Sequence, residues 1–314
     1  MNTKTLIWVL FIFLSLTWGS SFILMKRSMY PMGDDVMVLG PFQVGALRVA
    51  IAATVLLPLA YKFRKYLRAN NFWKLLVTGL FGNLIPALMF TLAETNIDSS
   101  LAGLLNMTTT FFVVLNGVMF YKANPTLKQL VGLALGSTGL YFVLSGQFNL
   151  EQTKDIRYAF FLFPATLGYA ISLTTIKFKL SHVPSVAITS LSFLLILPLA
   201  LIICFITSAF DPLMNNDNGW VAFGYLSILA VVGTAIAVLL FTKLISISNH
   251  IFASAVAYMI PVVAVFIGVA DGERFPPINY LWVAMIILGV YLMNRKGKVR
   301  DAKSVEEAKA ADSV

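Results

Sequence analysis

Long apolar segments alternate with short polar ones along the whole chain, and this pattern predicts membrane-spanning helices. A helix needs roughly 20 mostly apolar residues to cross the hydrocarbon layer, at a rise of about 1.5 Å per residue. The segments are continuously apolar rather than alternating with a period of two, which argues against membrane β-strands. The prediction is an all-α integral membrane protein with ten transmembrane helices, at about residues 5–24, 40–60, 74–92, 99–120, 128–145, 157–176, 185–207, 219–241, 251–270 and 279–294.

Basic residues are distributed unequally between the loops that ten spans would place on opposite sides. If both termini share a side, that side holds 17 of the 23 Lys and Arg residues and only four of the 14 acids. Cytoplasmic loops of membrane proteins carry an excess of Lys and Arg, so the pattern predicts a multi-pass protein with both termini in the cytoplasm. The N-terminal segment is interpreted as the first span rather than a signal peptide, because its apolar run continues through Leu24 without a small-residue cleavage site.

Composition narrows the class of protein. Hydrophobic residues make up 59% of the chain and charged residues 12%, whereas soluble domains contain about a quarter charged residues. A net charge of +9 would suggest nucleic acid as the partner of a soluble protein, but here it follows from topology, with basic loops facing anionic lipid heads. The single cysteine, Cys204, permits no internal disulfide and no thiolate cluster. We expect a small-molecule solute and membrane lipid as partners, no cofactor, metal or nucleic acid, and a monomer or homodimer.

The two halves of the chain resemble each other when the sequence is shifted by 151 residues. The shift aligns the third and fourth segments with the eighth and ninth without a gap. Matched glycines and prolines are the most informative, because each has a backbone reason for its position. The aligned pairs include Gly82 with Gly233, Gly117 with Gly268, Pro125 with Pro276, Ser21 with Ser172, Lys26 with Lys177 and Trp18 with Tyr169.

Five spans in each half would make the second half enter the membrane from the opposite side. Inverted repeats of this kind are a recurring design of transporters, in which two similar halves give one conformation open to each side. We predict a first repeat over residues 5–148, a second over 155–296, a linker over 146–157, and a frayed cytoplasmic tail over 297–314.

Several motifs resemble the EamA-type branch of the drug/metabolite transporter superfamily. Trp18-Gly19-Ser20-Ser21-Phe22 is similar to its first-helix signature, and Ala253 through Pro261 to Gly272-Glu273 is similar to the stretch that ends each repeat. The resemblance covers residues 6 to 296 and implies ten helices in two inverted repeats around a central solute cavity. The first repeat departs from the pattern, with Thr110 in place of the proline and Lys122 in place of the acid.

Two deep aromatic residues and two serines are candidates for a solute cavity. Trp18 lies about 13 residues into its helix, roughly 20 Å deep, and Tyr169 lies at a similar depth from the other side. Aromatic residues usually occupy membrane interfaces, so this depth favours a cavity wall. Ser21 and Ser172 follow one turn later on the same face. The alternative is that the serines are small helix contacts and the aromatic residues pack the bundle.

Polar side chains in the middle of spans provide further candidates. The amides of Asn83 and Asn106 need hydrogen-bond partners in hydrocarbon, so each is expected to face the bundle interior. Thr110 shares a helical face with Asn106, Tyr258 lies on the expected opposite helix, and Thr234 is the repeat mate of Asn83. These residues either contact solute or form hydrogen bonds between helices.

Arg48 is the one fixed charge deep in a predicted span. A buried guanidinium binds planar anions such as a carboxylate or phosphate, but it also satisfies backbone carbonyls or extends to the interface. No acid lies inside a predicted span, and Glu94 and Asp98 stand at the external ends of two of them. Glu94 is therefore the candidate for proton coupling. Pro86, Pro198 and Pro261 lie within spans, where they bend or loosen helices.

These features lead to one main hypothesis and two alternatives. The main one is an exporter of small metabolites, amino acids in particular, that works by alternating access in a bacterial inner membrane. The first alternative is a proton-coupled multidrug or sugar/nucleotide-type carrier. The second is a membrane enzyme or assembly subunit acting on lipid-linked intermediates, which would need acidic or histidine residues clustered at one face. No Walker sequence, nucleophile–base pair or metal-spaced cluster is present in the sequence, so we expect no enzymatic activity.

Overall fold

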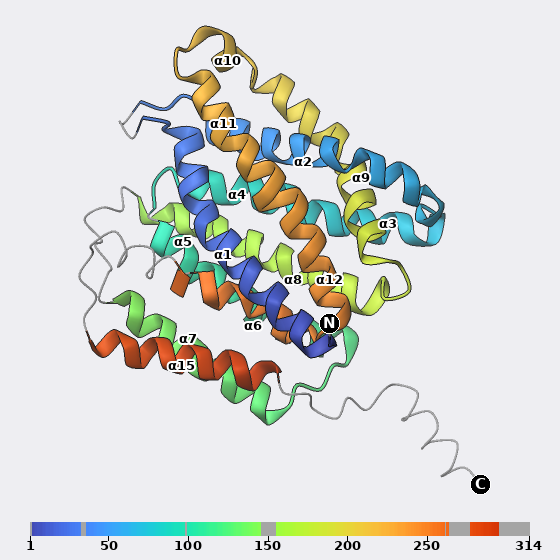
Figure 1. The fold of residues 1–314 in the computed structure, drawn as a ribbon, viewed down its shortest axis with the longest axis vertical. Coiled ribbons are helices and arrows are strands. Elements are labelled where there is room, and N and C mark those ends of the chain that lie inside the picture. The colour runs from blue at the N-terminus through green and yellow to red at the C-terminus, as the bar shows by residue number, and fades with distance from the viewer. Residues whose placement is uncertain are drawn as a thin grey trace.

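The computed structural model describes residues 2–32, 36–97, 99–145, 155–260, 262–263 and 277–294, and the regular structure in these ranges is helical. Figure 1 shows the helices gathered into one bundle. Several predicted features lie outside these ranges: Pro261, the Gly272-Glu273 pair, most of the linker, and the tail from residue 295.

The described residues of the first half of the chain form seven α-helices. The longest are the two that begin it, with 27 residues in the first and 23 in the second. The elements are α1 (Thr3–Met29), α2 (Pro41–Phe63), the 3₁₀ turn η1 (Arg64–Tyr66), α3 (Ala69–Gly79), the π-helical turn η2 (Leu80–Leu84), α4 (Ile85–Ala93), α5 (Ser99–Asn106), α6 (Thr108–Tyr121) and α7 (Leu127–Ser145).

The second half repeats much of this order. Its described elements are the 3₁₀ segment η4 (Ile156–Phe161), α8 (Leu162–Lys179), α9 (Ser185–Ile206), α10 (Asp211–Asn215), α11 (Gly219–Ala230), the π-helical turn η5 (Val231–Ile236), α12 (Ala237–Ile247), α13 (His250–Ser254), a helical continuation to residue 260, and α15 (Ile278–Asn294).

Six helices in the described ranges are long and apolar enough to cross a membrane. They fall on the first, second, third, sixth, seventh and eighth predicted spans: Thr3–Met29, Pro41–Tyr66, Ala69–Ala93, Arg157–Lys179, Ser185–Ile206 and Gly219–Ile247. The fourth predicted span is divided at Met107 into α5 and α6, and the fifth and tenth coincide with α7 and α15. The ninth is described only in part, so the count of ten stays a prediction.

Two π-helical turns interrupt long helices at positions 151 residues apart. η2 lies between α3 and α4, and η5 lies between α11 and α12. A π turn inserts a residue into the helical ladder and occurs often at functional sites. In η2, Asn83 Nδ2 donates to the Thr78 carbonyl oxygen at 3.5 Å; in η5, Thr234 Oγ1 donates to the Leu229 carbonyl oxygen at 3.1 Å. In both turns the side chain donates to the carbonyl oxygen of the residue five positions earlier, so the two hydrogen bonds have the same spacing.

Close helix pairs join the two halves. α2 packs along α9, and α7 packs along α15, which Figure 1 shows side by side at the lower edge of the bundle. Glycines permit the second contact: a Cβ on Gly132 would stand 2.6 Å from the Gly289 carbonyl oxygen, and a Cβ on Gly289 would stand 2.6 Å from that of Gly132. Small residues at such contacts let backbones approach, which is how helices associate without a hydrophobic driving force.

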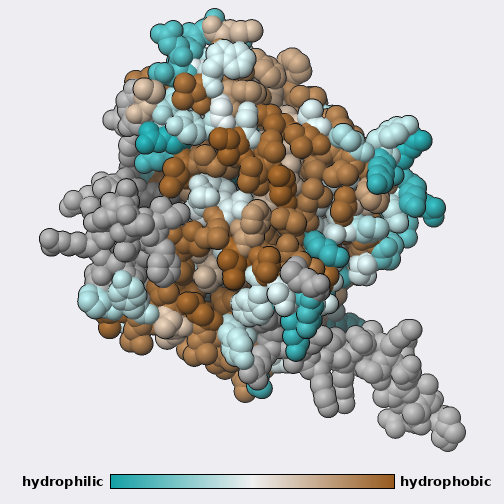
Figure 2. All heavy atoms as spheres, in the orientation of Figure 1, coloured by the Kyte–Doolittle hydropathy of each residue, from teal (hydrophilic) through white to brown (hydrophobic). Residues whose placement is uncertain are grey.

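Apolar side chains cover the middle of the bundle. Figure 2 shows them across the visible face, with hydrophilic residues gathered around α10 at the top and around the α2–α3 junction at the right edge. Large exposed side chains such as Phe120, Phe205 and Ile206 have more than two thirds of their surface accessible. A soluble protein would hide a contiguous apolar surface of this extent, so this surface fits a lipid environment.

Candidate functional site

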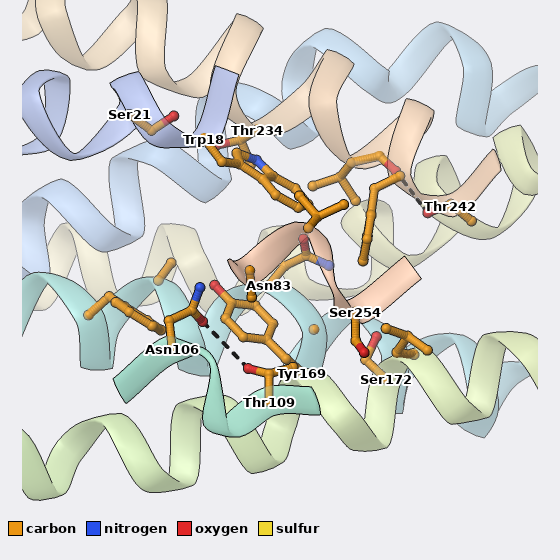
Figure 3. A pocket seen from close by; sticks show the side chains of 18 of the residues that line it. Trp18, Ser21, Asn83, Asn106, Thr109, Tyr169, Ser172, Thr234, Thr242 and Ser254 are labelled. Atoms are coloured by element: carbon orange, nitrogen blue, oxygen red, sulfur yellow. Dashed lines mark hydrogen bonds between the residues drawn. The ribbon is translucent and has the colours of Figure 1, made fainter. Parts of the chain in front are cut away.

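A central cavity of about 150 Å³ lies inside the bundle. Its wall is mostly apolar, with a limited set of polar side chains from both halves, as small-molecule sites usually have. Figure 3 shows Trp18 and Thr234 on one side of this space and Tyr169, Asn106 and Thr109 on the other.

Eight of the ten predicted site residues line this cavity. They are Trp18, Ser21, Arg48, Asn83, Asn106, Tyr169, Ser172 and Thr234. The sequence places them there because each is a polar or aromatic side chain deep in a helix, where hydrocarbon offers it no partner. That they contact solute stays a prediction.

Trp18 is anchored to the opposite half of the chain. Its indole Nε1 donates to the Gly233 carbonyl oxygen at 3.0 Å, and its ring meets Phe241 edge-on with centroids 4.9 Å apart. Gly233 belongs to the π turn η5, whose local unwinding leaves a carbonyl to accept this bond. The indole is therefore held in one orientation at the cavity wall, with its apolar face available to a solute.

Arg48 brings a fixed cation from α2 to the cavity. Its Nε donates to Thr234 Oγ1 at 2.6 Å, and Thr234 in turn donates to Leu229. Within the described ranges, the one ion pair is that of Arg157 with Asp155, so Arg48 has no carboxylate within 4.0 Å. The guanidinium is oriented by one nitrogen and retains its other N–H groups for an anion.

Tyr169 and the two amides form the opposing wall. Figure 3 shows Tyr169 rising beside Asn106 toward Asn83. Its ring lies 5.9 Å from that of Phe90. Asn106 Oδ1 accepts a hydrogen bond from Thr109 Oγ1 at 3.5 Å. At this length a hydrogen bond is weak. These amides therefore have hydrogen-bonding capacity left for a solute.

Each predicted serine packs against a glycine of the other half. A Cβ on Gly82 would clash with Ser172 Oγ, and a Cβ on Gly233 would lie 2.9 Å from Ser21 Oγ. The two contacts are related by the shift of 151 residues. Ser21 donates to the Thr17 carbonyl at 2.7 Å and Ser172 to that of Thr78 at 3.4 Å. The two serines therefore make close helix contacts and also line the cavity. The sequence had offered these two roles as alternatives.

Two predicted site residues lie outside the cavity lining. Thr110 donates to the Ser254 carbonyl oxygen at 3.2 Å, and the Tyr258 hydroxyl bonds Ser137 at 2.9 Å toward α7. The prediction assumed one continuous helix through Asn106 and Thr110. The helix is interrupted at Met107, which brings Thr109 rather than Thr110 to the cavity.

Sequence reasoning missed several polar lining residues, among them Thr78, Thr109, Ser192 and Ser254. Thr78 stands five residues before Asn83, a spacing that places two residues on one face only in a π turn. Ser192 Oγ is buried without a hydrogen-bond partner. The available signal for Ser192 was the run of hydroxyl side chains Thr189, Ser190 and Ser192 in a helix that is aliphatic over most of its remaining length.

Glu94 lies near this system but does not line it. It is the residue after the span Ala69–Ala93, and both its carboxylate oxygens are buried without a hydrogen-bond partner among the described residues. Burial raises the pKa of Glu94 well above its ordinary value, and the charges of Arg48 and Lys26 oppose this shift. A carboxyl in this setting favours its neutral form.

Comparison with known proteins connects this architecture to a family. The profile of the EamA-like transporter family matches twice, over residues 6–145 and 156–295. The chain is 26% identical over 194 residues to Protein PagO of Salmonella typhimurium, covering 61% of this chain and 62% of that protein. It is 26% identical over 282 residues to the uncharacterized transporter YetK of Bacillus subtilis, covering 85% and 82%.

A solved crystal structure has the same fold. It superposes with a TM-score of 0.66 over 94% of this chain and 100% of that chain, at 14% identity. The similarity at this identity concerns the fold alone, and the matched family occupies two successive segments of nearly equal length.

Proposed function

Because the chain belongs to the EamA-like transporter family, as a multi-pass membrane protein, we propose that it exports small metabolites, amino acids in particular, through the central cavity. The solute carboxylate contacts Arg48, and an apolar portion of the solute packs between Trp18 and Tyr169. Asn83 and Asn106 bind the remaining polar groups. The location we propose is a bacterial inner membrane, with both termini in the cytoplasm, as the loop charges predict.

The observation on which this proposal rests is the environment of Arg48. Arg48 has one nitrogen bonded to Thr234 and no carboxylate of the described residues within 4.0 Å, Glu94 lying beyond that distance, so its guanidinium is a ready receptor for a solute carboxylate. Burying a charge inside a membrane protein costs free energy, so a charge that is kept there is a candidate for a functional role. The aromatic walls on either side favour an amphipathic solute over a purely ionic one.

Alternating access is supported by the equivalence of the two halves. The paired π turns, the paired Ser–Gly contacts and the paired bonds of Asn83 and Thr234 place the same local structure on both sides of the cavity. We propose that the halves are inverted repeats that rock about these contacts, so that the cavity opens first to one side and then to the other.

Transport by purified protein in liposomes tests the proposal. A panel of labelled amino acids is offered with and without an imposed pH gradient, and uptake is compared for wild type and Arg48→Gln. Selective uptake that the substitution abolishes is expected. No uptake of any amino acid by folded protein would contradict the proposed solute and redirect the search to sugars, nucleotides or drugs.

Proton coupling is a second candidate, favoured by the unpartnered carboxylate of Glu94. A carboxyl with a raised pKa binds a proton at a higher pH than a carboxyl in water does, which is a property of groups that carry protons. In this case Glu94→Gln abolishes transport driven by a pH gradient and leaves exchange without a gradient intact. Equal gradient-driven rates in wild type and Glu94→Gln would contradict coupling through this residue.

A further inference from the structure

A second pocket lies at the end of the bundle where α2 leads into α3. Its lining comes from η1, from the start of α3 and from the turn between α8 and α9, and it has a volume of about 510 Å³. Figure 1 shows the α2–α3 junction and the α8–α9 turn on the same side of the bundle. We call it the basic pocket; it is lined by Lys65, Tyr66, Arg68, Asn70, Asn71 and His182.

The wall of the basic pocket is fixed by a buried amide. Asn71 is only 6% exposed; its Nδ2 donates to the Tyr66 carbonyl oxygen at 3.2 Å, and its Oδ1 lies 3.2 Å from His182 Nε2. Because an amide oxygen only accepts, His182 donates through Nε2. The amide thus connects the α2–α3 junction to the α8–α9 turn, so the pocket is a preformed feature and not a chance gap between mobile loops.

Positive charge is concentrated around this pocket without compensation. Five basic residues lie within 13 positions: Lys62, Arg64, Lys65, Arg68 and Lys74. The sequence contains no acid from residue 36 to 93 or from 158 to 210, and these segments supply the whole lining. The described residues include no ion pair to any of these five cations. Such a cluster repels itself unless an anion joins it.

Three of the five cations lie near aromatic rings, and the first is Lys62, whose Nζ is 5.9 Å from the centroid of Phe63. The Arg64 guanidinium carbon lies 4.3 Å from the centroid of Tyr61, and Lys65 Nζ lies 5.3 Å from that of Tyr66. These contacts limit the freedom of all three side chains, which lowers the cost of ordering them around a ligand. The start of α3 also has no acid in its first turn, so the partial positive charge of a helix N-terminus adds to theirs.

We propose that the basic pocket binds a phosphate group, and that its source is the headgroup of an anionic phospholipid. Lys and Arg at this density bind phosphate through charge-assisted hydrogen bonds. A lipid is favoured over a soluble phosphate because Tyr61 and Trp73, which flank the lining segment 65–71 in the sequence, are 68% and 69% exposed. Aromatic residues in such positions occupy the interface between headgroups and acyl chains. The site is independent of the central cavity and of the transport proposal.

Thermal unfolding of the purified protein in uncharged detergent tests this site. The probes are phosphatidylglycerol, phosphatidylcholine and soluble glycerol phosphate, each titrated into wild type, into Lys65→Gln/Arg68→Gln, and into a control with the same loss of charge, Lys128→Gln/Lys243→Gln. The control residues are exposed and lie outside the pocket. Far-ultraviolet circular dichroism without lipid verifies that all three proteins are folded.

We expect phosphatidylglycerol to raise the unfolding temperature of wild type and the control, while phosphatidylcholine does not. The pocket variant should bind phosphatidylglycerol about thirtyfold more weakly, since two basic residues near an anionic headgroup are lost. If glycerol phosphate raised the unfolding temperature of wild type as much as phosphatidylglycerol does, the pocket would still be a phosphate site, but a lipid headgroup would be ruled out as the required source. Equal weakening in pocket variant and control, or no response of wild type, would overturn the proposal.

Discussion

Trp18 on α1 donates its indole hydrogen to the backbone carbonyl of Gly233, in the π turn of the other half of the chain, at 3.0 Å. The bond connects the first helix directly to the irregular point of the eighth predicted span. The same π turn contains Thr234, the partner of Arg48. An aromatic residue of the cavity wall, Trp18, and the cavity's fixed cation, Arg48, are therefore oriented by adjacent residues of η5.

Trp18→Phe should reduce transport severalfold while the protein remains folded. Phenylalanine retains an aromatic surface but cannot donate to Gly233, and a hydrogen bond of this kind contributes about 1 kcal/mol. Initial uptake rates in liposomes measure the effect. Trp220→Phe is the matched control, because Trp220 is 63% exposed and lies outside the cavity. Equal losses in both variants would remove Trp18 from the site.

Arg48→Lys should weaken solute binding roughly tenfold to a hundredfold, because hydrogen bonds to charged groups contribute about 1.5–3 kcal/mol. Lysine keeps the charge but lacks the planar fork that holds Thr234 and a carboxylate together. The measurement is the solute concentration at half-maximal uptake. Arg27→Lys, at an exposed position, serves as the comparison. An unchanged half-maximal concentration in Arg48→Lys would rule out the guanidinium as the anion receptor.

Glu94→Gln should remove a pH dependence of stability that wild type has. The folded pKa of Glu94 lies well above its ordinary value of 4.5 because of burial. The folded protein therefore binds this proton more tightly than the unfolded chain, and stability falls as pH rises from 4.5 toward the folded pKa. Lys26 and Arg48 oppose the effect without reversing it. Thermal unfolding of both proteins across this pH range measures it, and parallel curves would contradict it.

Gly132→Ala should destabilise the bundle by about 1–3 kcal/mol, as overpacking does. The new methyl group would stand 2.6 Å from the Gly289 carbonyl oxygen, a backbone atom that cannot rotate away. Gly224→Ala is the control, since nothing lies within 4 Å of its Cβ position. Alanine there should be neutral or stabilising, because it favours a helix. Similar unfolding temperatures for the two variants would contradict the close contact of α7 with α15.

Tyr258→Phe should lower stability by about 1 kcal/mol and leave the half-maximal solute concentration unchanged. Its hydroxyl bonds Ser137 and does not line the cavity. Ser137→Ala should destabilise by a similar amount, because it removes the same bond. A change in solute affinity in Tyr258→Phe alone would return this residue to the solute site, as its sequence position had suggested.

The apolar pattern predicted the positions of the helices because hydrocarbon imposes one requirement on every span. Depth along the helix likewise identified Trp18, Tyr169 and Arg48 as candidates, and all three line the cavity. The pattern could not reveal η2 and η5, since one inserted residue leaves an apolar run unchanged. The break at Met107 also leaves no signal in the sequence, because no proline or glycine stands there. Thr78 and Thr109 were missed for these two reasons.

Backbone oxygen atoms supply part of the polarity around the central cavity. Thr78 O accepts bonds from Asn83 and Ser172, and Gly233 O accepts the bond from Trp18. Replacing the side chain of Thr78 leaves its oxygen in place. During evolution, the surrounding side chains can thus change and adapt the protein to new solutes while these acceptors persist. The irregular turns act as a constant framework on which substrate choice can diverge.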